Sequence, residues 1–492
     1  MGPVADALSA WSPLRIPAFR ALFFAMVVSN IGMWMQMVGA QWLLIDRPDA
    51  THLIALIQTA MTLPFALFAL PAGIVADNVD RRRMMIVVQS LQLFVGTLLA
   101  TWVVVDAIPP YLLLLLIFLL GTGTAISLIP FQSSVVELVP REQVPMAATM
   151  SGLSANIARA IGPALAGVLV AAYGIPLVFA INAATIGVYV FTLVRWKHDP
   201  KQRTAPREQF RPALIAGTRY VWHSPHIRKL LLRTILFTIP AQAIWALLPL
   251  VAKRQLGLDV GAYGILLGAL GVGAIAGAMS LPRLRAVWQT NVVVGIAMFS
   301  YAIAEVALSF TSSVWQAVPL LAIAGFGWIG TLSTIGGSLQ LYLPSWVRSR
   351  GVAINTVVLF GGQAIGAALW GYFATVMTLQ QSYWLAGALI ALASTVARIV
   401  PLTQVETLDR SHADYWPEPH AQLSDEELEG TVLVSIEYDV DPGKLQEFLD
   451  AMAYVRVVRI RTGGMQWALN RDVERPERFI ETYTAFRACR RC

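Results

Sequence analysis

The sequence has few charged residues and almost no cysteine. Only 13% of its 492 residues are charged and 57% are hydrophobic, whereas an average soluble domain has about 25% charged residues. Its two cysteines, Cys489 and Cys492, exclude a disulfide framework. The GxxxxGK[ST] motif of ATP-binding loops is absent, and the N-terminus lacks the pattern of a cleaved signal peptide. The composition therefore predicts a polytopic membrane protein, and the missing motif indicates that ATP is not its energy source.

Long apolar runs predict twelve transmembrane helices, because a bilayer core of about 30 Å needs roughly 20 apolar residues in a helix. The runs lie near residues 20–45, 52–76, 84–105, 110–136, 145–171, 174–194, 229–251, 261–281, 290–310, 315–340, 350–377 and 382–401. We therefore expect an all-α membrane fold with two six-helix halves. The predicted domains are residues 1–194 and 229–402, a cytoplasmic linker at 195–228 and a soluble cytoplasmic tail at 403–492.

Basic residues are unevenly distributed over the loops between these spans. With the N-terminus inside, 20 Arg and Lys residues lie in inner loops and three, Arg47, Lys253 and Arg254, lie in outer loops. Short loops rich in Arg and Lys stay in the cytoplasm. We expect a multi-pass protein of a bacterial inner (cell) membrane with both termini cytoplasmic. The net charge of +7 is spread over short clusters, which argues against a nucleic-acid partner.

An offset of 204 residues aligns the two halves without gaps over the second to fifth spans. Gly73 then matches Gly277, and Arg81 matches Arg285. The same offset pairs Gly121 with Gly325, Gly123 with Gly327, Gly162 with Gly366 and Gly167 with Gly371. Two related six-helix halves predict a transporter whose substrate site lies between them near the membrane centre.

The stretch GIVADNVDRRR, residues 73–83, resembles the signature of the major facilitator superfamily between spans two and three. Asp80 stands where that signature more often has Gly. The DRRR form, together with NIGMWMQMVGAQWLL in span one and ARAIGPALAG in span five, is similar to the enterobactin-exporter-like efflux branch. The resemblance covers about residues 10–400 and implies alternating access. It also implies a cytoplasmic gate formed by Gly73, Asp77, Arg81 and Arg82. Leu281 replaces the acid in the second half, so the gate is expected to be asymmetric.

Arg159 lies near the middle of the fifth predicted span, about 20 Å along a helix that starts near Pro145. An Arg at this depth costs at least about 2.5–3.5 kcal/mol, so it is expected to face a cavity. There it could contact an anionic or catechol-like substrate or tune proton coupling. The alternatives are an ion pair with Asp46 or Glu137, or a lining position without a specific function. The matching residue of the second half is Gln363, so the positive charge is one-sided, and Gln363 is itself a candidate for the substrate or proton pathway.

Other polar residues in the spans are candidates for the substrate or proton pathway. The amides Gln36, Asn156 and Gln242 lie in mid-span, where a hydrogen bond between helices is the alternative. Glu305 is the only acid well inside a span of the second half. It is either an acid near the membrane interface or a proton carrier.

The segment GPALAG contains Gly162, Pro163 and Gly167 and resembles the span-five motif of antiporters of this superfamily. This resemblance favours export, although packing alone would also explain small residues in a membrane helix. Trp34 and Trp245 suit a substrate that carries rings, but tryptophan is also common at membrane interfaces.

The tail predicts the order strand, helix, strand, strand from residue 431 onward. This order resembles a ferredoxin-like α+β domain of the antibiotic-biosynthesis-monooxygenase type, although the sequence stops where that fold needs another helix and strand. Trp467 and Asn470 are the only residues that suggest an enzymatic tail. The lone CxxC pair formed by Cys489 and Cys492 would need further ligands to bind zinc.

Together these features predict a proton-driven exporter of a small amphipathic compound, either a siderophore or a drug-like molecule. We expect a small-molecule substrate, the lipid bilayer and protons as partners, no cofactor, no metal and no enzymatic activity. The membrane part is expected to be monomeric, with a tail able to self-associate. Three alternatives stay open: an importer of the same fold, an enzymatic tail and a regulatory tail.

Overall fold

A computed structural model describes residues 11–106, 108–196, 218–344, 347–399, 431–462 and 464–486. These ranges contain twelve long helices: α2 (Pro17–Leu43), α3 (Ala50–Asn78), α4 (Arg81–Val104), α5 (Pro110–Leu138), α6 (Val144–Tyr173), α7 (Ile175–Arg195), α9 (Pro225–Leu250), α10 (Val260–Val287), α11 (Thr290–Leu308), α12 (Val314–Tyr342), α13 (Arg348–Val376) and α14 (Leu379–Ile399). Each coincides with one predicted span. Within the described part of the chain, eleven helices are long and apolar enough to cross a membrane. The helix α14 is not among them, so a twelfth span stays a prediction.

The helices begin at residues that suit a helix start. Asp80 precedes α4, and its side chain accepts a hydrogen bond from the Arg83 backbone N–H at 2.8 Å. Asp259 does the same before α10, accepting from the Ala262 N–H at 2.8 Å. An Asp at this position satisfies one of the free N–H groups of the first turn. Asp80, which departs from the family signature, therefore has a local structural role.

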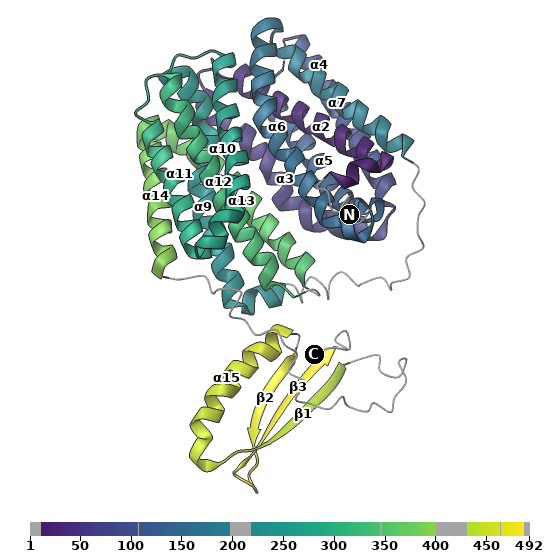
Figure 1. Cartoon of the computed structure of the whole chain (residues 1–492), viewed down its shortest axis with the longest axis vertical. Coiled ribbons are helices and arrows are strands. Elements are labelled where there is room, and N and C mark those ends of the chain that lie inside the picture. The colour runs from purple at the N-terminus through teal and green to yellow at the C-terminus, as the bar shows by residue number, and fades with distance from the viewer. Residues whose placement is uncertain are drawn as a thin grey trace, which may run out of the picture. The chain divides into compact units, whose positions relative to one another are not determined.

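The two halves of the helix bundle lie side by side, with α2–α7 on one side and α9–α14 on the other (Figure 1). Glycines aligned by the 204-residue repeat contact equivalent helices in each half. Gly73 faces Ile129 and Gly277 faces Phe326; Gly121 faces Met61 and Gly325 faces Leu270; Gly123 faces Gln92 and Gly327 faces Ala297. The packing of α3 on α5 is therefore repeated by α10 on α12. The repeat seen in the sequence is a repeat of helix packing.

The chain divides into two compact units, residues 1–207, 231–338 and 353–402 in one, and residues 208–230, 339–352 and 403–492 in the other. The predicted linker lies mostly outside the described residues, as do Cys489 and Cys492.

The described part of the tail is a three-stranded antiparallel sheet with one helix (Figure 1). Its elements are β1 (Thr431–Asp439), α15 (Leu445–Thr462), β2 (Met465–Arg471) and β3 (Arg478–Phe486), and the strand order is β1-β3-β2. The ring of Phe448 on α15 packs against Tyr438 and Phe479, with centroid distances of 5.5 and 5.2 Å. The predicted order of strands and helix is confirmed. The ferredoxin-like assignment stays a prediction.

Candidate substrate site between the two halves

Arg159 lies between two tryptophan rings that come from different halves of the bundle. Its Cζ atom is 5.7 Å from the ring centroid of Trp34 and 5.8 Å from that of Trp245. The two ring centroids are 5.9 Å apart. Trp34 is on α2 and Arg159 on α6, both in the first half, while Trp245 is on α9 in the second half. The guanidinium group therefore contributes a cation–π contact across the interface.

Several polar atoms of this cluster are buried and make no hydrogen bond with any described residue. They are Nε and Nη1 of Arg159, both side-chain amide atoms of Gln242 and Nε1 of Trp245. Leaving a buried polar group unpaired costs about 1–3 kcal/mol, so each such group needs an explanation. Gln242 lies one helical turn before Trp245 on α9, and these unpaired groups can be satisfied by water or by the oxygen atoms of a ligand.

An aromatic wall continues this cluster into the second half. The ring of Trp328 on α12 lies 5.5 Å from Trp245, 5.7 Å from Phe237 and 6.2 Å from Tyr301, measured between centroids. The sequence prediction missed Trp328. The available signal was its depth, because it lies in the middle of α12 whereas membrane tryptophans concentrate at the interfaces. The 204-residue offset places Thr124 at its position in the first half.

The other predicted pathway residues are distributed differently. Gln36 is buried and accepts a hydrogen bond from the Asn182 side chain, so it joins α2 to α7 within the first half. Asn156 donates to the Gly152 carbonyl oxygen of its own helix at 3.1 Å. Gln363 is buried on α13. Of the three mid-span amides proposed from the sequence, Gln242 alone has both polar atoms buried and unpaired within the described residues.

The GPALAG segment fixes α6 against helices of both halves. A Cβ atom added at Gly162 would lie 2.6 Å from Cβ of Trp34 on α2, and one added at Gly167 would lie 2.8 Å from the Val260 carbonyl oxygen at the start of α10. Gly264 of α10 approaches Pro163 in the same way, with a Cβ–oxygen distance of 2.6 Å. The small residues of this motif therefore allow the close approach that positions Trp34 beside Arg159.

The halves are joined at the end of the bundle where α2 ends and α3 begins, which we call the α2–α3 end. Lys253 Nζ lies 3.2 Å from a carboxylate oxygen of Asp46, and Arg254 donates to Thr51 Oγ1 at 2.9 Å. The alternative in which Arg159 pairs with Asp46 is therefore not seen, because Asp46 pairs with Lys253. The alternative partner of Arg159, Glu137, has a side chain outside the described ones.

Contacts between the halves continue from this end toward the membrane centre. The Tyr263 hydroxyl donates to Gln41 Oε1 at 2.7 Å, joining α10 to α2. Farther along, the rings of Phe65 on α3 and Phe360 on α13 stack with centroids 4.4 Å apart. Phe65 lies about 22 Å along α3 from its first residue. The halves are thus packed together from the α2–α3 end past half of a bilayer core of about 30 Å.

The residues of the predicted gate lie near the junction of α3 and α4. Arg82 donates to the carbonyl oxygens of Leu193 at 3.1 Å and Val194 at 2.7 Å, so it satisfies free carbonyl groups in the last turn of α7. Arg81 is half-buried, and the side chain of Asp77 is outside the described ones. In the second half Arg285 donates instead to Thr334 Oγ1 at 3.0 Å. The role of Arg82 is therefore explained by helix capping.

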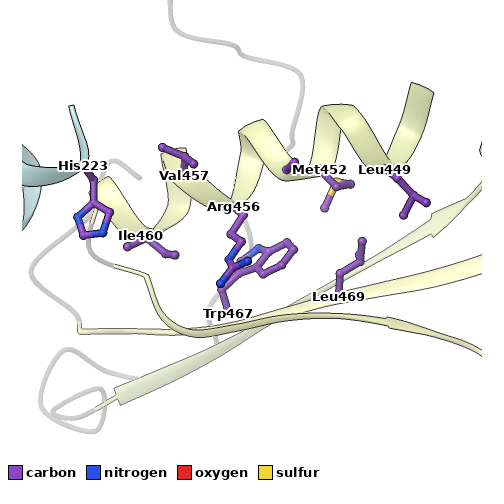
Figure 2. Close-up of a pocket in the computed structure, with 9 residues that line it drawn as sticks. His223, Leu449, Met452, Arg456, Val457, Ile460, Trp467 and Leu469 are labelled. Atoms are coloured by element: carbon purple, nitrogen blue, oxygen red, sulfur yellow. The ribbon is translucent and has the colours of Figure 1, made fainter. Parts of the chain in front are cut away.

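The tail contains an open groove of about 540 Å³ between α15 and β2, shown in Figure 2. Arg456 lies over the ring of Trp467, with its Cζ atom 5.6 Å from the ring centroid. The groove is lined by Leu449, Met452, Ala453, Arg456, Val457 and Ile460 of α15, Trp467 and Leu469 of β2, and His223. Asn470, next to Leu469 on β2, lies on the opposite face of the sheet because strand side chains alternate. The two residues that suggested an enzymatic tail are therefore not brought together.

A buried carboxylate connects the elements of the tail. Glu481 accepts hydrogen bonds from Arg459 Nε at 3.1 Å, from Trp467 Nε1 at 2.8 Å and from the Tyr438 hydroxyl at 2.8 Å. Burial, together with the hydrogen bond to Glu481, raises the pKa of Tyr438 to about 12. Glu481 thereby stabilises the packing of β1, β2 and α15 around β3.

The helix bundle, the family model and the curated relatives identify a transporter of the major facilitator type, a multi-pass integral membrane protein. The chain belongs to the transmembrane secretion effector family, whose model matches residues 8–487. It is similar to the enterobactin exporter EntS of Salmonella typhimurium, with 26% identity over 370 residues, covering 74% of this chain and 87% of the relative. The EntS protein of Citrobacter koseri is 25% identical over 370 residues, covering 74% and 86%.

Solved structures of transporters share the fold. A bacterial homolog of the human lysosomal transporter Spinster, in an inward-facing and unoccupied conformation, has a TM-score of 0.58 at 15% identity and covers 79% of this chain and 95% of its own. The nucleoside transporter NupG has a TM-score of 0.61 at 10% identity, covering 80% and 100%. A POT family transporter in complex with 5-aminolevulinic acid has a TM-score of 0.62 at 11% identity, covering 77% and 95%. At these identities the likeness concerns the fold alone.

Proposed function

We propose that this transporter exports a catechol-like or anionic aromatic compound of the siderophore class by alternating access, driven by inward proton movement. The observation that carries the proposal is the position of Arg159 between Trp34 and Trp245, with unpaired guanidinium nitrogens at the interface of the halves. An Arg binds acidic oxygen atoms through paired N–H donors, and the flanking indoles offer faces for stacking rings. The names of the relatives, enterobactin exporters, are in accord with this substrate class.

The proposed orientation leaves the site accessible from the cytoplasm in this conformation, which supports export. We place the α2–α3 end at the outer face of the cell membrane and both termini in the cytoplasm, with all twelve helices across the bilayer. This orientation is in accord with the distribution of basic residues in the loops. The packing of the halves at the α2–α3 end then supports a conformation closed to the outside. A substrate would approach Arg159 from the cytoplasm, as export requires.

The proposed cytoplasmic gate is formed by Gly73, Asp77 and Arg81 at the junction of α3 and α4. Arg82 is left out of the gating step because its hydrogen bonds to the end of α7 already account for it. The second half lacks the acid, and Arg285 there binds a hydroxyl group. Only the first half is therefore proposed to contribute a charge-based latch.

Transport into everted membrane vesicles tests the function. With an acidic vesicle interior, the wild type should accumulate enterobactin. Arg159→Gln should raise the apparent KM about thirtyfold, because losing a desolvated cation–π and charge contact costs about 2 kcal/mol. Arg20→Gln is the matched control, since it removes an exposed positive charge in the first turn of α2 and should leave the kinetics unchanged.

A second probe separates the role of the charge from general damage. Ethidium is an aromatic cation, so Arg159→Gln should not impair its transport. Equal handling of enterobactin by the wild type and Arg159→Gln would refute the substrate site. Accumulation only in right-side-out vesicles with an acidic exterior would refute export and establish the importer alternative.

A further inference from the structure

Glu305 is a buried acid in the second half of the bundle. It lies on α11, three residues before the helix ends at Leu308, and its side chain has no exposed surface. The sequence left open whether this residue is an acid near the membrane interface or a proton carrier. The structure places it in the protein interior, so a carboxylate facing the membrane surface is excluded for this conformation.

No side chain among the described residues pairs with the carboxyl group of Glu305. Both of its oxygen atoms are buried without a hydrogen bond, and no ion pair involves it within that part of the chain. The groups around it are Tyr301 of the same helix, Tyr383 of α14 and the backbone of Ile244 on α9. The Tyr301 hydroxyl donates elsewhere, to the Ala241 carbonyl oxygen at 2.7 Å.

An ionised carboxylate in this environment would be an uncompensated buried charge. Burying a charge without a partner costs several kcal/mol, and the group avoids this by taking up a proton. No cation faces Glu305 among the described residues, and the neighbouring titratable groups are tyrosines, which are neutral near pH 7. In this conformation Glu305 therefore holds a proton.

The burial of Glu305 is linked to the closed α2–α3 end. Gln255, in the π-helical turn Val251–Gln255, donates to the carbonyl oxygens of Leu308 at 3.2 Å and Thr311 at 2.8 Å, next to the end of α11. The same turn carries Lys253, which pairs with Asp46 in the loop between α2 and α3, and Arg254, which donates to Thr51 in the first turn of α3. Separation of the halves at this end would pull on the turn that covers the end of α11.

Glu305 is also linked to the Arg159 cluster through α9 and the aromatic wall. The Tyr301 hydroxyl binds α9, and its ring contacts Trp328, which in turn contacts Trp245. On the adjacent face of α9, Gln242 and Trp245 leave three polar atoms unpaired within the described residues. These atoms can bind water along α9.

We propose that Glu305 carries the coupling proton of this transporter. The carboxylate takes up a proton from the outside when the α2–α3 end is open, and the resulting neutral acid allows this end to close. Water that enters from the cytoplasmic side along Gln242 and Trp245 then hydrates the acid, so that the proton leaves toward the cytoplasm and a hydrated carboxylate is restored. This inference rests on the proposed function for the direction of transport, but the protonation of Glu305 in the closed conformation does not.

Transport assays with Glu305→Gln test the coupling. Gln is a neutral isostere of the protonated acid, so reconstituted protein should retain enterobactin counterflow within about twofold of the wild type. It should lose accumulation driven by a pH gradient, which for one proton reaches at most about tenfold per pH unit. Glu305→Asp should retain gradient-driven accumulation. Accumulation by Glu305→Gln equal to that of the wild type would refute the proposal.

Infrared spectroscopy tests the protonation without any substrate. Purified full-length wild type near neutral pH should show a band of a protonated carboxyl group that Glu305→Gln lacks. Glu142→Gln, an exposed Glu outside the spans, is the matched control and should keep the band. If Glu305→Gln keeps every protonated-carboxyl band of the wild type, the inference is refuted even if the protein transports. Absence of all transport by the wild type refutes the proposed function and leaves this band as a separate result.

Discussion

Substituting Gly167 by Ala should weaken the packing between the two halves at the α2–α3 end. The added Cβ atom would lie 2.8 Å from the Val260 carbonyl oxygen and 3.1 Å from Cα of Gly261. Both are backbone atoms at the start of α10, which cannot rotate away as a side chain can. Overpacking of this kind costs about 1–3 kcal/mol. The cost applies only while α6 and α10 are in contact, so the population open at this end should rise about 5–150-fold.

Gly152→Ala is the matched control on the same helix. A Cβ atom at Gly152 would meet no atom within 4 Å, so this substitution should leave the packing unchanged. Ala is also the better helix former by about 1 kcal/mol, which makes a loss of stability in the control unexpected.

Electron paramagnetic resonance distances between spin labels measure the opening. Labels at Arg47 and Ser312, both exposed at the α2–α3 end on different halves, would be placed in a background without Cys489 and Cys492. The longer-distance population should grow in Gly167→Ala and stay at the wild-type level in Gly152→Ala. An unchanged distance distribution and an unchanged melting temperature in Gly167→Ala would refute the packing argument.

Two further substitutions test local roles. Arg82→Gln should lower the melting temperature, because it removes charge-assisted hydrogen bonds worth about 1.5–3 kcal/mol to the end of α7. Enterobactin transport per folded molecule should persist. A transport defect without destabilisation would instead support a role of Arg82 in the gate. Tyr438 should ionise near its raised pKa of about 12, so the stability contributed by its neutral form is complete below pH 10 and is lost as the pH rises toward 12. The difference between the ultraviolet titration curves of the wild type and Tyr438→Phe measures the ionisation of Tyr438. Ionisation near pH 10 would contradict the raised pKa.

The fold was largely predictable because membrane helices depend on long apolar runs that can be read from the sequence. The order of elements in the tail was predictable for a similar reason, since its strand alternation and helix start are local signals. Asp80 could also have been identified locally, because an Asp directly before a helix suggests an N-cap. The family signature, in which Gly is more common at this position, gives no sign of its hydrogen bond to the Arg83 N–H.

The site was only partly predictable because its chemistry depends on distant partners. Gln36 and Gln242 are both mid-span amides, yet Asn182 binds Gln36 whereas Gln242 has buried, unpaired polar atoms among the described residues. The depth of Arg159 was readable from spacing, but the rings that flank it come from helices far apart in the sequence. In the sequence Lys253 is one of three basic residues in the predicted outer loops, and no local signal indicates its pairing with Asp46 across the two halves.

The packing glycines recur in both halves of the bundle, but the groups proposed to bind the substrate and to form the gate do not. The repeat aligns Arg159 with Gln363, Trp328 with Thr124 and Asp77 with Leu281. The contacts that hold the helices together and the proposed binding and gating chemistry therefore occupy different positions of the repeat. Substitutions at the unrepeated positions are accordingly expected to change the substrate while the repeated glycine contacts persist.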